Sequence, residues 1–198
     1  NRRWWTNDSR IEKEVNKQKE LLTILESNDI NIDILKENDV CLMGGSILKL
    51  MMELPLDSDL DLYFKDYEKY KNVDDYFDDS FECIEVTNAF KNYKCKDLIV
   101  QLIWNNDNNV RWGKGSYNDV VSNFDFTIIT GGYEFKNEMF RYSPTYFDDI
   151  SHKRLICNHW PLRVENYHTI EQLLGRIDKF KKMGFTISSD LLNQIKEL

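Results

Sequence analysis

Apolar residues recur at intervals of three and four near both ends of the chain, which is typical of amphipathic helices. This pattern predicts helices over the segments 9–27, 30–37, 46–53, 170–185 and 189–197. Ser9 and Glu12 form a capping box at the start of the first helix. The third helix is expected to end before Pro55, and the chain beyond Pro144 is expected to be largely helical.

Short apolar or alternating runs fill the middle of the chain and indicate strands. They predict strands over the segments 40–43, 58–64, 81–86, 88–94, 98–104 and 124–130. Among the intervening segments, 66–79 is a helix or an acidic loop, and 105–115 is a polar loop that contains glycine. Ser116 is expected to cap a further short helix.

This order of elements predicts an α/β (α+β) fold, a small mixed β-sheet flanked by helices. We expect the sheet and its helices to form a core over residues 31–150. Residues 1–30 are expected to be an N-terminal helix packed on this core, and residues 151–198 a helical C-terminal part.

Composition narrows the class of protein. The 198 residues are 41% hydrophobic and 30% charged, which indicates a globular chain. No run approaches 18 consecutive apolar residues, so no membrane span is expected. A net charge of −8 argues against a basic surface for duplex nucleic acid. The sequence does not begin with Met, so we expect it to be trimmed.

The cysteines and histidines lack the spacing of metal ligands. The four cysteines, Cys41, Cys83, Cys95 and Cys157, include no C-x-x-C pair. We therefore expect buried free thiols in a reducing, cytoplasmic setting. The three histidines, His152, His159 and His168, are expected to be surface or structural residues.

Candidate chemistry begins with the run Asp57, Asp59 and Asp61, at alternate positions of a predicted strand. Strand side chains alternate between faces, so the three carboxylates share one face, about 7 Å apart. Unscreened carboxylates repel each other. A divalent cation between Asp59 and Asp61 removes this repulsion, and all-oxygen ligands suit Mg²⁺.

Two glycines precede this strand in a way that suits phosphate binding. A turn through Gly44 and Gly45 brings backbone N–H groups close to a ligand, because no Cβ intervenes. The N-terminus of the helix that follows favours phosphate, and Ser46 adds a hydroxyl there. Together with the aspartates, this order predicts a site for a nucleoside triphosphate and its metal ions.

Three simpler interpretations stay open at this point. Gly44-Gly45 is compatible with an ordinary turn, and the aspartates with the solvated face of an edge strand. The third is a calcium loop, because Asp57, Asp59, Asp61 and Glu68 occupy positions 1, 3, 5 and 12 of an EF-hand. Position 6 of such a loop is Gly, whereas this chain has Leu62.

The segments "MGGS" and "DLDL", with twelve residues between Ser46 and Asp59, resemble the hallmark of the polymerase β-type nucleotidyltransferase superfamily. The family carries a third carboxylate on a later strand, and Asp125 in "VSNFDFTII" is the candidate. The order of later segments over residues 38–187 is similar to that of small nucleotidyltransferase-like proteins encoded by bacteriophages. The resemblance therefore implies a nucleotidyltransferase-like core.

The resemblance also implies two-metal transfer of a nucleoside monophosphate from an NTP to an acceptor hydroxyl, with Mg²⁺ or Mn²⁺. Asp59 and Asp61 would bind both metals, and Asp125 would hold the metal that activates the hydroxyl, or act as a base. Gly44, Gly45 and Ser46 would bind the phosphates. Lys49, one helical turn after Ser46, would reach a phosphate.

The acceptor is predicted less directly. An RNA 3′ end is favoured, because basic clusters at 91–96, 111–114 and 176–182 are candidates to line a groove. Several aromatic residues are candidates to stack bases: Trp104, Trp112, Tyr117 and Trp160. Two alternatives are a toxin-type transferase acting on tRNA and a catalytically silent nucleotide- or RNA-binding module. A phage-encoded chain would act in the host cytoplasm.

Overall fold

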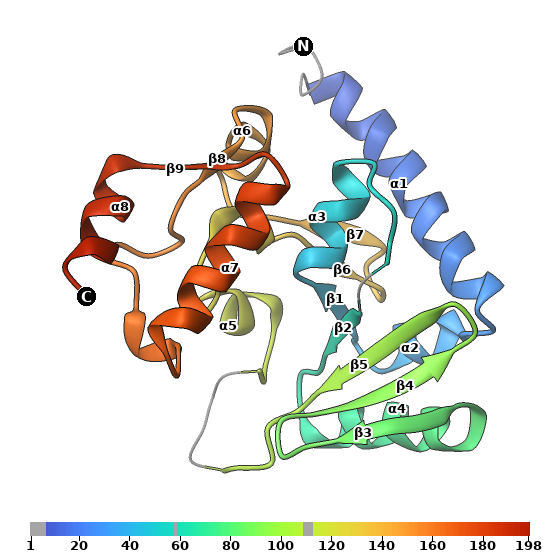
Figure 1. Ribbon diagram of the computed structural model, residues 1–198. Coiled ribbons are helices and arrows are strands. Elements are labelled where there is room, and N and C mark those ends of the chain that lie inside the picture. Colours follow the sequence, from blue (N-terminus) through green and yellow to red (C-terminus); the bar gives the residue numbers. More distant parts are fainter. Residues whose placement is uncertain (1–6, 58, 109–112) are drawn as a thin grey trace. The chain divides into compact units, whose positions relative to one another are not determined.

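The computed structural model describes residues 7–57, 59–108 and 113–198, which form two compact units (Figure 1). The first unit comprises the described residues up to Asn123 together with Gly131–Tyr142. The second comprises Phe124–Thr130 and Ser143–Leu198, so residues 143–150, which the sequence assigned to the core, belong to it. Among the helices in the described ranges, none has the length and apolar character needed to cross a membrane.

A seven-stranded mixed sheet forms the centre of the first unit, in the order β3-β4-β5-β2-β1-β6-β7. Its strands are β1 (Cys41–Met43), β2 (Leu60–Tyr63), β3 (Glu82–Val86), β4 (Phe90–Cys95), β5 (Leu98–Ile103), β6 (Gly132–Glu134) and β7 (Met139–Arg141). β2 runs parallel to β5, and the other neighbouring pairs are antiparallel. The predicted strands in residues 40–104 are confirmed, whereas the hairpin β6–β7 was not predicted.

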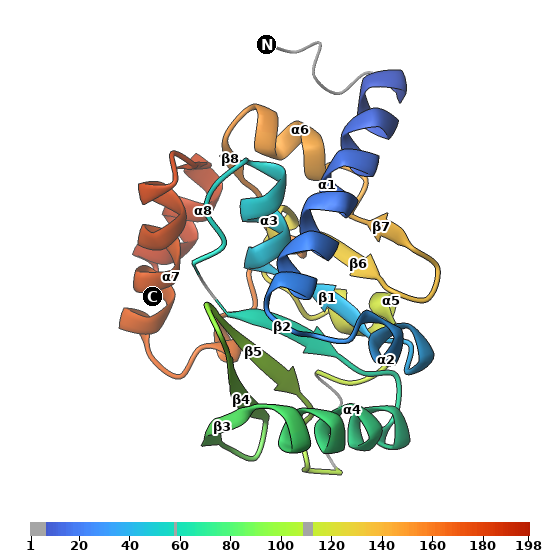
Figure 2. The same ribbon diagram turned by 90° about the vertical axis from the view of Figure 1, so that its right-hand side faces the viewer.

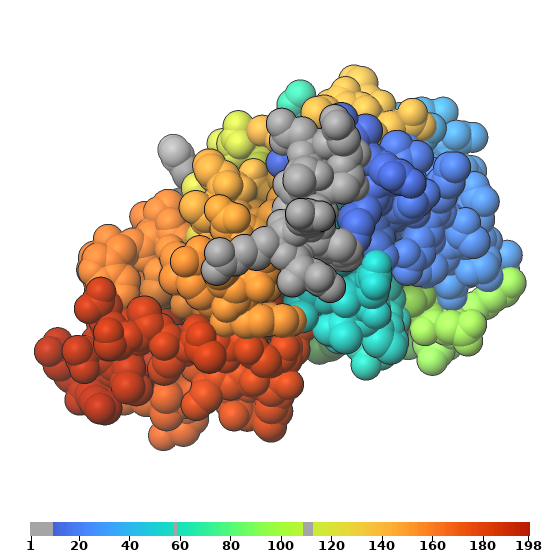
Figure 3. Space-filling view, turned by 90° about the horizontal axis from the view of Figure 1, so that it is seen from above, coloured from blue at the N-terminus to red at the C-terminus, as the bar shows by residue number. Residues whose placement is uncertain are grey.

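Helices accompany the sheet in this unit: α1 (Asn7–Ser27), α2 (Ile32–Glu37), α3 (Gly45–Met51), α4 (Tyr67–Ser80) and α5 (Tyr117–Val121). α1 packs against α2 and α3, as Figure 2 shows, and buries Leu21 and Leu25. In the space-filling view of Figure 3, the blue surface of α1 adjoins the turquoise segment after α3, where Lys17 pairs with Glu53 at 3.7 Å. The N-terminal helix therefore packs on the helices that accompany the sheet.

The two faces of the sheet differ in polarity because side chains alternate along each strand. Leu60 and Leu62 of β2 lie beside Val100 and Leu102 of β5, and all four are buried. Tyr93 of β4 lies on this apolar face and packs against Phe77 of α4, with ring centroids 5.4 Å apart. The opposite face of the same strands carries the polar residues of the candidate site.

The second unit contains three α-helices in the described residues, α6 (Tyr146–Ser151), α7 (Ile170–Lys182) and α8 (Ser189–Lys196). A pair of two-residue parallel strands, β8 (Arg154–Leu155) and β9 (Thr186–Ile187), was not predicted. Phe126 packs edge-on against Phe180 of α7, with ring centroids 5.7 Å apart. This contact joins the segment Phe124–Thr130 to the C-terminal helices.

The predicted strand over 124–130 is wrong. Thr127–Ile129 forms a 3₁₀ turn, and Phe126 makes only an isolated bridge to Cys157. The physical reason lies in two threonines, whose hydroxyls form hydrogen bonds that compete with strand pairing. The hydroxyl of Thr127 donates to Asp149, and that of Thr130 donates to the carbonyl of Thr127.

Candidate nucleotide-binding site

Asp61 lies within β2, between β5 and β1 in the sheet. Asp59 directly precedes the strand and is partly exposed, as is Asp61. Asp57 precedes the strand by three residues and pairs with Lys49 of α3. Because Ser58 lies outside the described residues, the predicted alternation holds from Asp59 onward, and Asp57 lies outside the strand.

The interior position of β2 contradicts two of the simpler interpretations. The aspartates are not on an edge strand, because β2 has a neighbour on each side. The calcium loop is also wrong: Asp61 lies in a strand, Leu62 is buried and Glu68 lies in helix α4. A sharp turn at Leu62, which an EF-hand loop requires, is incompatible with a strand.

Gly44 joins β1 to α3 and lies against the Asp61 carboxylate. Its φ of +100° and ψ of −145° are accessible almost only to glycine. A Cβ on Gly44 would lie 3.7 Å from Asp61 Oδ2, so a larger side chain would crowd the carboxylate. The N–H of Gly44 donates to the carbonyl of Gly131 at 3.2 Å, which fixes the turn. The structure therefore brings the glycine turn and the second aspartate of the motif together.

Ser46 has an unusual environment for a hydroxyl residue. It is 4% exposed, and its Oγ has no hydrogen-bond partner. A buried hydroxyl without a partner costs about 1–3 kcal/mol, so this position is unfavourable unless a ligand satisfies it. Gly45 precedes it, with no atom within 4 Å of where a Cβ would lie. Gly45 therefore leaves open space at the start of α3, and Ser46 supplies a hydroxyl there that lacks a partner.

These residues fit one divalent cation bound together with nucleotide phosphates. Mg²⁺ usually takes one or two carboxylates, substrate phosphates and waters, and Asp59 and Asp61 supply the carboxylates. In the described residues there is no group of three or more His, Cys, Asp or Glu side chains arranged to hold a metal. The predicted binding of Mg²⁺ or Mn²⁺ by these residues stays a prediction.

Asp125, the predicted third carboxylate, belongs to the second unit and is engaged there. Arg176 donates to both of its oxygens, at 3.0 Å from Nη2 and at a shorter distance from Nε. The hydroxyl of Tyr167 donates to Oδ2 at 2.5 Å. Burial opposes the charge of Arg176, but the hydrogen bonds and charge of Asp125 raise the Arg176 pKa. The structure thus gives Asp125 a structural partner, and its catalytic role stays a prediction.

A row of polar side chains crosses the open face beside Asp61. Gln101 of β5 is in register with Asp61, Asn92 of β4 with Gln101, and Glu85 of β3 with Asn92. Gln101 Nε2 donates to Asn92 Oδ1 at 3.0 Å, and Asn92 Nδ2 donates to Glu85 Oε2 at 2.8 Å. Gln101 was not predicted as a site residue, although it is the single polar residue in the apolar run Leu98–Ile103.

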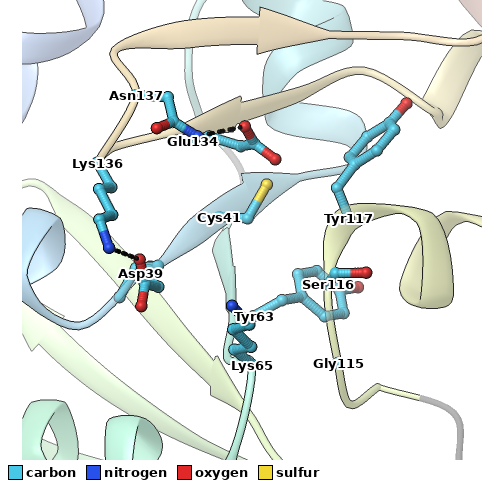
Figure 4. A pocket seen from close by; sticks show the side chains of 11 residues that line it. Asp39, Cys41, Tyr63, Lys65, Gly115, Ser116, Tyr117, Glu134, Lys136 and Asn137 are labelled. Atoms are coloured by element: carbon cyan, nitrogen blue, oxygen red, sulfur yellow. Dashed lines mark hydrogen bonds and ion pairs between the residues drawn. The ribbon is translucent and has the colours of Figure 1, made fainter.

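A pocket of about 120 Å³ lies further along the same face (Figure 4), between β1, β2, β6 and residues 115–117. Neither Gly44 nor Asp61 lines it. Among its lining residues, Lys136 pairs with Asp39 at 3.2 Å, and Asn137 donates to Glu134 at 3.2 Å. These interactions occupy polar groups of the pocket. The glycine turn and the aspartates are therefore the better candidate for the nucleotide-binding site.

The predicted basic groove is weakened by acidic partners. Lys91 pairs with Asp74 at 2.8 Å, and Lys96 pairs with Asp29 at 2.9 Å. Lys182 likewise pairs with Asp178. Arg111 lies outside the described residues. The cluster at 91–96 is therefore largely neutralised, and net charge there does not favour RNA.

Two of the aromatic candidates are engaged by neighbouring side chains. Trp104 stacks on Tyr70, with centroids 5.7 Å apart and planes 12° apart. Tyr117 is buried, and Arg141 lies over its ring at 4.6 Å. Trp160 is 58% exposed, and Trp112 lies outside the described residues. Base stacking therefore has support only from Trp160.

The thiols differ from the expected burial in one case. All four cysteines are free; Cys41 and Cys95 are buried, Cys157 is half-buried and Cys83 is exposed. Burial raises the pKa of Cys95 to about 12. Burial and the charge of Asp125 raise the pKa of Cys157 to about 11. These thiols are protonated at neutral pH and are unsuited to nucleophilic chemistry.

Comparison with known proteins begins with families. A family model described as "Gabija anti-defense 2 family protein" matches residues 12–153. This range includes the whole glycine–aspartate motif and most of the first unit. A sequence search of curated proteins found no match.

Solved structures of CCA-adding and tRNA-processing enzymes are similar to the chain. The Thermotoga maritima CCA-adding enzyme complexed with tRNA has a TM-score of 0.64 at 12% identity, over 88% of this chain and 42% of that one. A CCA-adding enzyme with ATP has a TM-score of 0.68 at 12% identity, over 94% and 44%. A tRNA-processing enzyme with CTP has a TM-score of 0.60 at 14% identity, over 80% and 42%.

The likeness to these structures concerns the fold alone, because the identities are low. The chain spans less than half the length of each enzyme. Its mixed sheet flanked by helices is similar to the nucleotidyltransferase fold of the CCA-adding enzymes, which confirms the predicted fold class.

Proposed function

The chain belongs to the Gabija anti-defense 2 family, and from this premise and its fold we propose that it is a metal-dependent nucleotidyltransferase. It binds an NTP through the Gly44 turn, Gly45 and Ser46, and a divalent cation through Asp59 and Asp61. The observation that carries the proposal is the packing of Gly44 against Asp61. A Cβ on Gly44 would lie 3.7 Å from Asp61 Oδ2. The φ of +100° at Gly44 favours glycine at this turn beside the carboxylate.

The transfer step needs few groups from the protein. The oxygen of the acceptor hydroxyl forms a bond to the α-phosphorus, the bond from that phosphorus to the bridging oxygen breaks, and pyrophosphate leaves. The hydroxyl proton passes to solvent or to a nearby base. A bound divalent cation would neutralise the phosphate charge. The chain's own contribution is to orient the triphosphate through Ser46 and the glycine turn.

Lys49 has a smaller role in this proposal. Its ammonium pairs with Asp57, so binding to phosphate requires an exchange of partners. Phosphate carries more charge than one carboxylate, and this exchange is favourable when the triphosphate is near. Asp125 is held by Arg176 and Tyr167, so the proposal does not depend on it.

For the acceptor, we propose an RNA 3′ end. Support comes from solved structures of similar fold that are complexed with tRNA, ATP and CTP. The family description supports an anti-defense role, and we propose that the reaction takes place in the cytoplasm of a phage-infected host. A tRNA acceptor in that host is one form of the same proposal.

A catalytically silent nucleotide-binding module is the second candidate. Two observations favour it: Asp125 is engaged by Arg176, and a neutral residue, Gln101, lies beside Asp61. Both interpretations require the same nucleotide site, and they differ only in whether transfer follows binding.

The test uses labelled NTPs with Mg²⁺ or Mn²⁺ and mixed RNA, and measures label incorporation and the nucleotide-induced thermal shift. Asp59→Asn is expected to abolish both transfer and the metal-dependent shift. The control is Asp79→Asn, which removes an exposed carboxylate on α4 and is expected to behave as wild type. A shift without transfer supports the silent module. Equal activity in Asp59→Asn and wild type contradicts the proposed site.

A further inference from the structure

The polar row on the open face has a direction that its hydrogen bonds determine. A carboxylate only accepts hydrogen bonds, so Glu85 requires the amide nitrogen of Asn92 to point toward it. Asn92 Oδ1 then points the other way and accepts from Gln101 Nε2. Because its nitrogen is committed to Asn92, Gln101 presents its carbonyl oxygen, Oε1, on the side away from β4.

That side is the side of β2. Gln101 and Asp61 are in register on adjacent parallel strands, which lie about 4.8 Å apart. In the described part of the chain, the Gln101 side chain makes no hydrogen bond besides the one to Asn92. Asn92 is 6% exposed, so water contributes little to setting its orientation. The row therefore ends in a fixed, neutral oxygen acceptor beside the Asp61 carboxylate.

We propose that Gln101 is a neutral oxygen ligand of the divalent cation that Asp61 binds, and that Glu85 and Asn92 hold its carbonyl in place. The inference rests on the proposed nucleotide site. Carbonyl and carboxylate oxygens both suit Mg²⁺ and Mn²⁺. A cation with ligand distances of about 2.1 Å fits between side chains on strands at this spacing.

A neutral ligand at this position has two consequences. The cation keeps more positive charge for the triphosphate than it would beside a third carboxylate. A carboxamide also cannot accept the proton of the acceptor hydroxyl. Gln101 would therefore strengthen the attraction between the cation and the triphosphate without acting as a base.

The experiment reverses the direction of the row. Lysine only donates hydrogen bonds, so Glu85→Lys turns the Asn92 amide around, and Gln101 then presents its NH₂ group beside Asp61. Free Mn²⁺ is measured by electron paramagnetic resonance during titration with a non-hydrolysable NTP analogue. Substitution of a residue that orients a metal ligand typically lowers metal affinity 10–100-fold, so a loss of about tenfold or more is expected.

Two further variants separate orientation from charge. Asp79→Lys makes the same charge change at an exposed position of α4 and is expected to leave Mn²⁺ affinity unchanged. Adding Gln101→Glu to Glu85→Lys restores an oxygen beside Asp61, because Asn92 now donates to position 101. The double variant is expected to recover or exceed wild-type affinity. Matched thermal unfolding curves show that each variant is folded.

The outcomes distinguish this inference from the function on which it rests. If wild type binds no Mn²⁺–nucleotide complex, both are wrong. If wild type binds it and Glu85→Lys matches Asp79→Lys, only the role of Gln101 is wrong. If Glu85→Lys weakens binding and Gln101→Glu does not restore it, the loss is not due to amide orientation, and the inference is also wrong.

Discussion

At the scale of single residues, Ser46 is expected to contribute to NTP binding but not to the stability of the fold. Its buried hydroxyl has no partner, so folding loses the hydrogen bonds that the group makes to water in the unfolded chain. Natural cores keep few such groups. A ligand that accepts or donates at this hydroxyl accounts for the residue, and phosphate is the ligand we propose.

Ser46→Ala is therefore expected to leave the free energy of unfolding unchanged or to raise it by about 1 kcal/mol. The same change is expected to weaken NTP binding about tenfold, because a hydrogen bond to a charged group contributes about 1.5–3 kcal/mol. Urea unfolding and isothermal titration with an NTP analogue measure the two effects.

Ser143 provides a matched control for this substitution. Its Oγ is also buried without a partner, but it lies in the second unit. Ser143→Ala should change stability as Ser46→Ala does and leave NTP affinity at the wild-type value. A loss of stability without a loss of affinity in Ser46→Ala would show that the hydroxyl has a structural role only.

At the scale of elements, the hydrophobic pattern of the sequence was sufficient to predict a strand where side-chain periodicity alone decides the structure. The alternation of Asp59 to Leu62 and the apolar run from Leu98 to Ile103 predicted β2 and β5 correctly. The same reasoning failed at Phe124–Thr130, where an equally apolar, β-branched run forms a 3₁₀ turn. Hydrogen bonds of threonine hydroxyls decide that turn, and Asp149, the partner of Thr127, is distant in sequence.

The hairpin β6–β7 was missed for a different reason. Gly131 and Gly132 look like a loop, although Tyr133 and Phe140 are buried and directly paired across the hairpin. Each strand has three residues, which is too short for periodicity to be distinct. The available signal was a buried aromatic residue on each side of Asn137, Tyr133 before it and Phe140 after it.

Asp125 and Arg176 join the segment Phe124–Thr130 to α7, and this contact makes a prediction for the second unit. Asp125→Asn removes the charge that balances a guanidinium only 33% exposed. The free energy of unfolding is expected to fall by roughly 2–3 kcal/mol. Thermal unfolding and limited proteolysis of α7 measure this loss.

The control is Asp178→Asn, which removes an exposed partner of Lys182 on the same helix. Surface pairs contribute about 0–1 kcal/mol, so its stability should be close to wild type. If Asp125→Asn instead keeps its stability and loses nucleotide transfer, the carboxylate is catalytic, as the family resemblance implies, and the structural interpretation is wrong.

At the scale of the whole molecule, the site depends on register, which the sequence shows poorly. The motif residues Gly44, Ser46, Asp59 and Asp61 were predicted because they are close in sequence. Gln101 and its partners are in line with Asp61 only because β2 pairs in parallel with β5 and β5 pairs with β4. A shift by one residue would place Gln101 on the apolar face, and no local pattern excludes that shift.

Burial of thiols across the molecule makes a prediction about alkaline pH. Burial raises the pKa of Cys95 from 9.0 to about 12. In the unfolded chain this thiol loses its proton near pH 9, whereas the folded chain holds it. Stability is therefore complete below pH 9 and falls as the pH rises from 9 toward 12, by up to about 1.4 kcal/mol per pH unit for each such thiol.

Urea unfolding of wild type and Cys95→Ala at pH 8, 9 and 10 tests this prediction. The variant is less stable at pH 8 because it lacks a buried side chain, but its stability should fall less steeply above pH 9. Cys83→Ala, which removes an exposed thiol, should keep the wild-type slope. If all three proteins lose stability in parallel between pH 9 and 10, burial of Cys95 is not what makes the fold sensitive to alkali.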